Sequence, residues 1–343
     1  MKRYSFFMLM LLVLSSFSCG KKGSTGDTDV APSNLTVTAL VSTDNSGNVN
    51  FTATAANAVT FEYGFGNGAF QTVPSGVVTY KYAATGNYTV NVVAKSATGK
   101  TSTKSIEITV IVSTSLVWND EFNSNGAPDP AKWGYDIGTG SSGWGNNELQ
   151  YYTSRPENAV VQNGVLKINL IKENFSGSPY TSTRLLSRGK FSFKYGTVEV
   201  RAKLPAGGGT WPAIWMLGNN ISTAGWPACG EIDIMEHKGN DLNRIYGTLH
   251  YPGRSGGNAD GNTRVISNAT TEFHIYKVEW TAASIKIYVD DQIIHTVANS
   301  SAIPFNHEFF LILNVAMGGT FGGAVDPNVT NATMEVDYVR VSL

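Results

Sequence analysis

Three carboxylates, Glu231, Asp233 and Glu236, lie close together in a segment that is otherwise mostly apolar. In a β-strand, side chains alternate between the two faces, so Glu231 and Asp233 share one face while the isoleucines beside them point to the other. Strict alternation would place Met235, and not Glu236, on the carboxylate face. We therefore expect one extra residue in this strand, a β-bulge, that returns Glu236 to the face of the other two carboxylates.

Two carboxyl groups on one face have the chemistry needed to cleave a glycosidic bond. When they lie about 5–5.5 Å apart, one can attack the anomeric carbon while the other protonates the leaving oxygen, and the anomeric configuration is retained. The alternative is a solvated acidic face without function. That alternative is disfavoured because like charges repel each other, and the nearest cation in the sequence, Lys238, lies beyond the triplet.

The segments around the triplet have the pattern of short strands. Residues 196–204 and 285–289 alternate apolar with polar side chains. No convincing helical periodicity occurs within 116–343, so we expect two stacked sheets, a β-jelly-roll sandwich. Residues 34–112 also alternate, between glycine-bearing turns, which predicts a separate, small immunoglobulin-like β-sandwich. The expected fold class is all-β.

The carboxylate motif, together with residues 211–217 (WPAIWML), resembles glycoside hydrolase family 16, and its bulged Glu-x-Asp-x-x-Glu form resembles the laminarinase-like branch. The other segments that carry the resemblance are 118–122, 144–149, 194–196, 313–319 and 336–340. It implies that 116–343 is a retaining endo-β-1,3-glucanase acting on laminarin-type β-glucan. The alternatives are a mixed-linkage glucanase or galactan hydrolase of the same fold, or a non-catalytic glycan-binding surface protein, which the intact triplet argues against.

The resemblance implies a role for each carboxylate. Glu231 is the nucleophile, Glu236 is the general acid/base, and Asp233 hydrogen-bonds the nucleophile and tunes it. Elementary electrostatics agrees, because Asp233 can share a proton with Glu231, while repulsion and burial keep Glu236 protonated near neutral pH. We expect the three groups to titrate as a coupled set.

Tryptophans just before the triplet suggest a sugar-binding surface. An indole ring offers a flat apolar face on which the C–H groups of a sugar can stack, and the resemblance places Trp211 and Trp215 in the glycone subsites. Core packing is the alternative for both. The resemblance also implies hydrogen bonds to sugar from Asn146, Asn147 and Arg184 and places His250 near the cleaved bond; bracing of surface loops is the alternative role for these four.

No cofactor is expected for the chemistry, but the resemblance implies a structural calcium ion. Its ligands would be the carboxylate of Asp337 and the main-chain oxygens of Glu121 and Gly164, and hard oxygen ligands suit calcium. The five histidines show no paired spacing, so a catalytic transition metal is not expected.

The smaller sandwich resembles a PKD domain, an immunoglobulin-like spacer common in secreted polysaccharide-degrading enzymes. The residues that carry this resemblance are 63–68 (YGFGNG), 80–82 (YKY) and 86–90 (GNYTV). The Trp-Asp and Gly-Asp-Gly of the usual signature are missing here. A passive spacer is favoured over a carbohydrate-binding module.

The N-terminus has the layout of a secretory signal, in which Lys2 and Arg3 precede an apolar run. The run is shorter than the about 20 residues that span a bilayer. We expect residues 1–18 to be a signal peptide and 19–33 to be a flexible tether. Cys19 resembles the lipidated cysteine of a bacterial lipobox; the alternative is an ordinary cleaved signal. The expected product is exported and membrane-anchored, facing the periplasm or the cell surface, or otherwise secreted.

Charge and composition exclude other classes of protein. The formal net charge of the 343 residues is -1, and no basic run exceeds Lys21-Lys22, so a nucleic-acid partner is not expected. An apolar content of 42% excludes general disorder. The expected partner is the β-glucan substrate, and the protein is expected to be a monomer.

Overall fold

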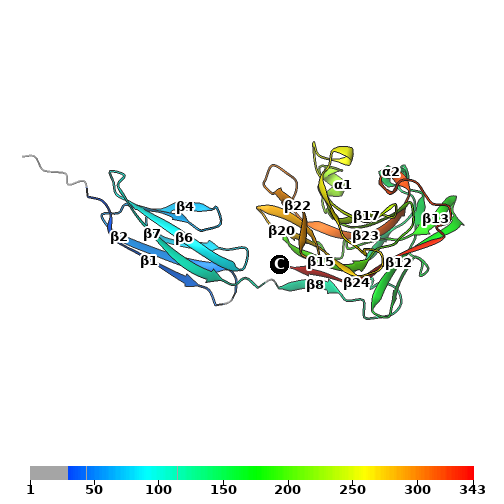
Figure 1. Ribbon diagram of the computed structural model, residues 1–343, viewed down its shortest axis with the longest axis horizontal. Coiled ribbons are helices and arrows are strands. Elements are labelled where there is room, and N and C mark those ends of the chain that lie inside the picture. The colour runs from blue at the N-terminus through cyan, green and yellow to red at the C-terminus, as the bar shows by residue number, and fades with distance from the viewer. Residues whose placement is uncertain (1–29, 44, 114) are drawn as a thin grey trace, which may run out of the picture. The chain divides into compact units, whose positions relative to one another are not determined.

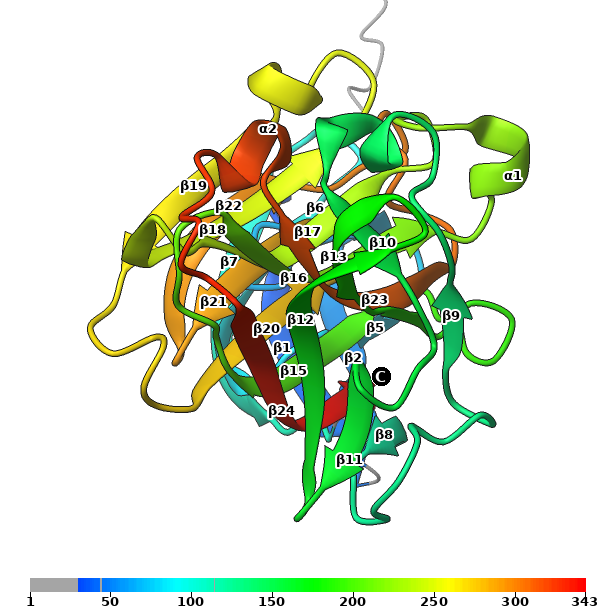
Figure 2. The same cartoon turned by 90° about the vertical axis from the view of Figure 1, so that its right-hand side faces the viewer.

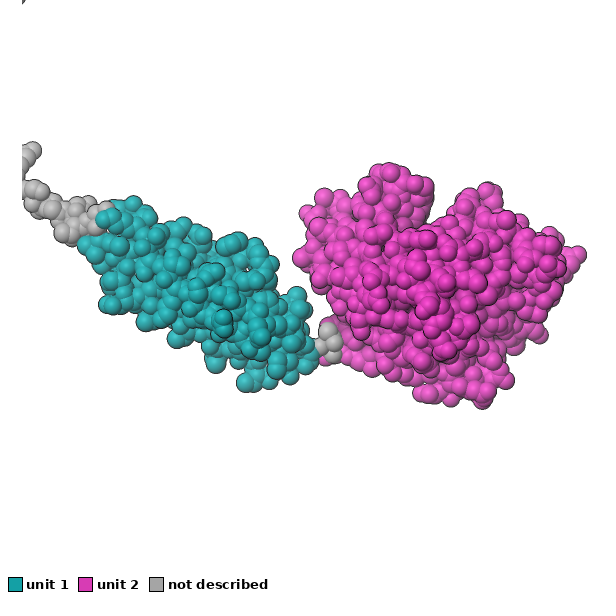
Figure 3. All heavy atoms as spheres, in the orientation of Figure 1, with its two compact units in different colours: residues 1–113 teal, residues 114–343 magenta. Residues whose placement is uncertain are grey.

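The computed structural model describes residues 30–343 except 44 and 114 (Figure 1). The chain divides between residues 113 and 114 into two compact units, which Figure 3 colours separately. The predicted signal peptide, the lipidation site Cys19 and nearly all of the tether 19–33 lie outside the described residues. In the described part of the chain, no helix has the length and apolar character needed to cross a membrane.

The N-terminal unit is a sandwich of two antiparallel sheets. Its strands are β1 (Ser33–Val41), β2 (Asn48–Ala56) and β5 (Val77–Lys81) in one sheet, and β4 (Phe70–Val73), β3 (Thr60–Gly64), β6 (Gly86–Lys95) and β7 (Thr101–Val110) in the other. Aromatic side chains such as Phe51, Tyr63 and Phe65 pack between them and are almost fully buried. The predicted immunoglobulin-like sandwich is therefore confirmed.

The C-terminal unit is built from two large sheets, which can be followed in Figure 2. The ten-stranded sheet contains β10 (Gln150–Tyr152), β13 (Ser178–Ser182), β12 (Val165–Phe175), β24 (Asn331–Ser342), β15 (Gly196–Lys203), β20 (His274–Trp280), β21 (Ser284–Val289) and β22 (Gln292–Ala298), with β11 (Ala159–Gln162) on β12 and β8 (Leu116–Asp120) on β24. The seven-stranded sheet runs in the order β19 (Asp260–Val265), β18 (Asp241–His250), β17 (Glu231–Lys238), β16 (Thr210–Gly218), β23 (Phe309–Met317), β14 (Arg184–Leu186) and β9 (Gly134–Asp136). Two short helices, α1 (Ile221–Ala224) and α2 (Gly319–Gly322), lie in loops. The predicted jelly-roll sandwich is confirmed.

The core of this unit lies between the sheets and follows from the alternation in the sequence. On β15, Val198, Val200 and Ala202 are fully buried, and the polar residues between them face outward. The central strand β23 is buried along its whole length, and Asn314 is the one polar residue in it. Burying an amide in such a strand is favourable only when its hydrogen bonds are satisfied, so Asn314 marks a place where polar groups meet.

Candidate active site

The catalytic face depends on an irregularity in β17. On the neighbouring strand β16, consecutive residues pair with Asp233 and Met235, which leaves Ile234 as the extra residue. Pairing with β18 shifts over the same stretch, between Asp233 and Glu236. Ile234 and Met235 are both fully buried. The predicted bulge is confirmed, and it allows Glu231, Asp233 and Glu236 to lie on one face.

Full burial of Asp233 and Glu236 and partial burial of Glu231 raise the pKa values of all three acidic groups. Asp233 is 3% exposed and Glu236 is 9% exposed, and burial disfavours the charged form of a carboxyl group. Burial, reinforced by the charge of Asp233, raises the pKa of Glu231 to about 8. Burial raises the pKa of Asp233 to about 7. Burial and the charges of both neighbours raise the pKa of Glu236 well above its usual value.

Two indole N–H groups oppose this effect at the outer carboxylates. Trp226 Nε1 donates to Glu231 Oε2 at 2.7 Å, and Trp211 Nε1 donates to Glu236 Oε1 at 2.9 Å. Each bond favours the ionised acceptor and lowers its pKa.

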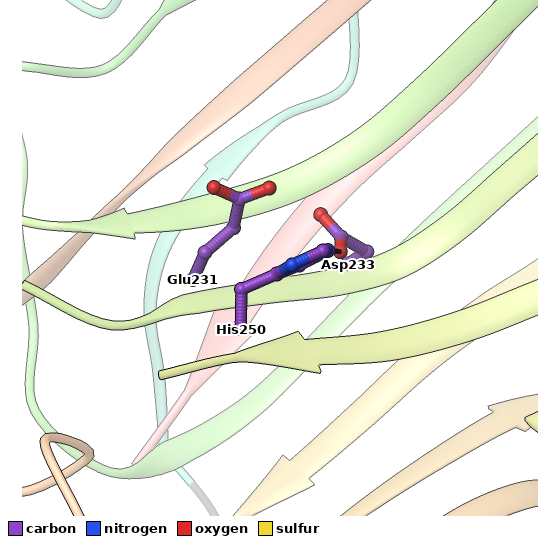
Figure 4. A group of neighbouring side chains, drawn as sticks. All are labelled: Glu231, Asp233 and His250. Carbon is purple, nitrogen blue, oxygen red and sulfur yellow. Dashed lines mark ion pairs between the residues drawn. The ribbon is translucent and has the colours of Figure 1, made fainter. Parts of the chain in front are cut away.

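His250 faces the middle carboxylate, as Figure 4 shows, with Nε2 lying 3.2 Å from Asp233 Oδ2. The backbone N–H of Gly256 donates to His250 Nδ1 at 3.1 Å. The two side chains are at ion-pair distance, and Asp233 Oδ2 has no hydrogen-bond partner among the described residues. Ligand atoms of Glu231, Asp233 and His250 all lie within 4.8 Å of one another.

Arg184 lies on the carboxylate face, clamped between two indoles. Its guanidinium carbon is 4.5 Å from the ring centroid of Trp144 and 4.7 Å from that of Trp215. Its Nε is 3.1 Å from Asp136 Oδ2. In the sheet, one row of paired residues runs Glu236, Ala213, Asn314, Arg184 and Asp136. Because such residues share a face, the register joins the carboxylates to the arginine.

The remaining predicted sugar-binding residues lie in two places. The ring of Trp211 packs on Phe321 of α2 at 5.1 Å between centroids. Asn146 and Asn147 belong to the turn Gly143–Asn147; Asn146 Nδ2 donates to Glu148 Oε1 at 3.1 Å, and Asn147 is exposed with φ 59°.

The residues proposed for calcium lie apart from this face. Asp337 is on β24, Glu121 directly follows β8, and β8 and β12 both pair with β24. The Glu121 carboxylate is held by Arg340 through two bonds of 2.9 Å, so only its main chain is available as a ligand. Asp337 Oδ2 accepts from Arg201 at 2.5 Å, which leaves its second oxygen for a metal. The donor set consists of oxygens, as calcium prefers, although Arg201 competes for the carboxylate.

The sequence analysis assigned no role to four residues of the site, Trp226, Trp144, Glu148 and Asn314, although the last three lie in segments that carry the family resemblance. Trp226 stands five residues before Glu231 on the loop after α1, and no periodicity shows that the loop turns its indole back onto the carboxylate. Asn314 did carry a signal, because it interrupts an apolar strand.

Comparisons with known proteins agree with this geometry. Residues 146–340 match the family described as Glycosyl hydrolases family 16. The chain belongs to glycosyl hydrolase family 16. In this family 16 enzyme, residues 30–112 also match the PKD domain, as the resemblance of the smaller sandwich predicted.

Relatives of this family 16 enzyme include a "Beta-glucanase" from Rhodothermus marinus, 48% identical over 243 residues, which cover 66% of this chain and 84% of the relative. The solved laminarinase from the same organism has a TM-score of 0.65 and 47% identity, covering 67% of this chain and 97% of that one. The catalytic domain of an endo-1,3-beta-glucanase (laminarinase) from Thermotoga petrophila has a TM-score of 0.64 and 44% identity, covering 67% and 98%.

The raised pKa values predict a pH-dependent stability. The folded chain holds carboxyl protons that the unfolded chain loses above about pH 4, so the free energy of unfolding falls as the pH rises toward the folded pKa values. Glu231→Gln cannot ionise. It should melt roughly 2–6 °C above wild type at pH 8 and by a smaller margin at pH 4.5, as measured by calorimetry of the full chain.

Glu157→Gln is the matched control, because Glu157 is exposed. It should melt like wild type at both pH values. An equal gain for Glu231→Gln at pH 8 and at pH 4.5 would contradict the raised pKa.

Proposed function

We propose that this chain is an endo-β-1,3-glucanase that hydrolyses laminarin-type β-glucan by double displacement with retention of configuration. The observation that carries the proposal is the bulged strand β17, which holds Glu231, Asp233 and Glu236 on one face beside stacked indoles. The similarity to laminarinases and β-glucanases supports this choice of substrate.

In the first step, a carboxylate oxygen of Glu231 attacks the anomeric carbon and forms a glycosyl ester. Glu236 gives its proton to the departing glycosidic oxygen, so the bond breaks without releasing an alkoxide. In the second step, Glu236 takes a proton from water, the water oxygen attacks the anomeric carbon, and Glu231 leaves as carboxylate. Two inversions retain the β-configuration.

The electrostatics of the site suits this division of roles. Glu236 keeps its proton because burial and the charges of two neighbouring carboxyls raise its pKa well above its usual value. Glu231 and Asp233 can hold one proton and one negative charge between them, and Trp226 stabilises the charge when it lies on Glu231. When Glu231 attacks, the shared proton belongs on Asp233. His250 Nε2 lies 3.2 Å from Asp233 Oδ2, beside the carboxyl group that takes this proton.

The sugar-binding groups fit a neutral polysaccharide. Indole faces stack on the C–H surfaces of sugar rings, and Trp211 and Trp215 provide these faces. Arg184 is the cation of this cluster, and Asp136 already neutralises it. A sulfated galactan would favour unpaired Arg or Lys contacts instead.

The first measurement is proton NMR of laminarin incubated with the full chain, recording which anomer forms before mutarotation. Early β-anomer is expected, because double displacement inverts twice. Glu231→Ser should lose at least about 10³-fold in kcat, since the nucleophile is gone, while still binding laminari-oligosaccharides.

Early α-anomer would contradict the retaining mechanism, and full turnover by Glu231→Ser would contradict the assignment of the nucleophile. If the enzyme forms no product from laminarin but hydrolyses a mixed-linkage glucan or a galactan, the proposed substrate is wrong and the proposed mechanism still stands.

We also propose that the protein is exported and acylated at Cys19, which would tether the enzyme to a membrane near its polymeric substrate. Expressed in a bacterium that acylates lipoproteins, wild type should incorporate labelled palmitate and Cys19→Ala should not. Equal labelling of both, or none of wild type, would contradict lipidation.

A structural calcium ion is proposed at Asp337 with the main-chain oxygens of Glu121 and Gly164. Bound only to the folded state, it would stabilise the catalytic unit by mass action. Removal with EGTA should lower the melting temperature by roughly 2–8 °C, and added calcium should restore it. Asp337→Asn should melt at the same temperature with and without EGTA. A wild-type melting temperature insensitive to EGTA and calcium would contradict the site.

A further inference from the structure

A chain of hydrogen bonds leads away from one of the indoles into the protein. Trp215 Nε1 donates to Asn314 Oδ1 at 2.8 Å, Asn314 Nδ2 donates to Tyr152 Oη at 3.0 Å, and Tyr152 Oη donates to Glu148 Oε2 at 3.3 Å. Tyr152 is fully buried and Asn314 is 6% exposed, so water does not readily replace their partners. The chain joins β16, β23, β10 and the segment before β10.

The donor-to-acceptor direction of this series of hydrogen bonds is fixed at both ends. An indole N–H can only donate, and an ionised carboxylate can only accept. Every donor between them must therefore point toward Glu148, which sets the orientation of the Asn314 amide and of the Tyr152 hydroxyl. An apolar side chain at position 148 would leave the buried hydroxyl of Tyr152 without its acceptor, which is costly.

The other oxygen of the same carboxylate fixes a second amide. Asn146 Nδ2 donates to Glu148 Oε1 at 3.1 Å. Because the carboxylate accepts only, the amide of Asn146 cannot flip without losing this bond. Its carbonyl oxygen is therefore directed away from Glu148, so Asn146 can offer that oxygen as an acceptor, and the second N–H of its amide as a donor, to a sugar hydroxyl.

Glu148 is itself anchored to the sheet. Gln150 Nε2 donates to Glu148 Oε2 at 2.7 Å, and Gln150 Oε1 accepts from the backbone N–H of Met317 at 2.8 Å. Gln150 is fully buried, and the backbone of Glu148 forms a bridge with Gly318. The carboxylate is thus held by β23, the strand that also carries Asn314.

We propose that Glu148 is a positioning residue for substrate binding, acting through Asn146 and through the chain to Trp215. Trp215 forms one wall of the clamp around Arg184, so the same carboxylate also sets the place of that guanidinium. The inference rests on the proposed function, because it treats Asn146, Trp215 and Arg184 as sugar contacts. A purely structural role for Glu148 would affect stability and leave substrate binding unchanged.

The test compares variants of the full chain. Glu148→Leu removes both acceptors and should raise KM for laminarin on the order of tenfold, with kcat within about threefold and an unchanged pH profile, because misplaced contacts weaken binding while Glu231 and Glu236 remain. Glu148→Gln keeps one acceptor oxygen for Tyr152 and Gln150 and should recover most of the loss. Tyr152→Phe removes the hydroxyl that links Asn314 to Glu148 and leaves Glu148 in place. It should also raise KM, and it tests the inference independently if Glu148→Leu does not fold.

Glu279→Gln is the matched control. Glu279 also accepts a tyrosine hydroxyl, that of Tyr288 at 2.7 Å, but it lies on β20 of the ten-stranded sheet. This variant should have the KM and kcat of wild type.

A second readout does not depend on turnover. In spectra of protein labelled with ¹⁵N-tryptophan, the indole signal of Trp215, assigned with Trp215→Phe, should shift in Glu148→Leu and in Tyr152→Phe and stay in place in Glu279→Gln. An unmoved signal, or a lower melting temperature with unchanged KM, overturns the inference. Wild type that hydrolyses no β-glucan would instead contradict the proposed function, and the indole shift would still decide the role of Glu148.

Discussion

The burial of Asp233 and Glu236 and the partial burial of Glu231 on one strand face are the constraint on which the rest of the site depends. Such groups repel each other when ionised and lose hydration when buried, so the fold must supply specific partners. It supplies an indole N–H to Glu231 from Trp226 and another to Glu236 from Trp211, and it places His250 beside Asp233. The two indole hydrogen bonds favour the ionised forms of Glu231 and Glu236, but burial outweighs them, so the pKa values of both groups remain raised. The chemistry proposed here needs that balance, because one carboxyl must be charged while another keeps its proton.

The two indole N–H groups nearest the proposed sugar surface both point into the protein. Trp211 donates to Glu236 and Trp215 donates to Asn314. Polar bonds therefore fix the edge of each ring, and the ring faces remain for apolar contact. The polar and apolar parts of each tryptophan thus have separate roles. The N–H fixes the orientation of the ring, and the ring face is the part proposed to contact sugar. Arg184 uses one face of Trp215 in the same way.

Local features of the site could be predicted from the sequence, and long-range ones could not. The bulge was predictable because alternation along β17 is a property of consecutive residues, and the three carboxylates need it to share a face. The sandwich folds followed from the same alternation. The roles of Trp226 and Glu148 could not be predicted from the sequence, because they arise from loop geometry and from the pairing of distant strands. Asn314 shows the intermediate case: its polarity inside an apolar strand marks a buried network, but the sequence does not name its partners.

Two polarised networks therefore meet in the seven-stranded sheet, each ending on carboxylates. In one, indole N–H groups donate to Glu231 and Glu236 on either side of Asp233; in the other, donors starting at Trp215 converge on Glu148. The difference lies in how completely the acceptors are satisfied. Glu148 accepts hydrogen bonds from three side-chain donors, which hold its carboxylate in place. The triplet has fewer donors for each carboxyl and raised pKa values, and this is the difference between the carboxyls proposed to react and the one proposed to position the substrate.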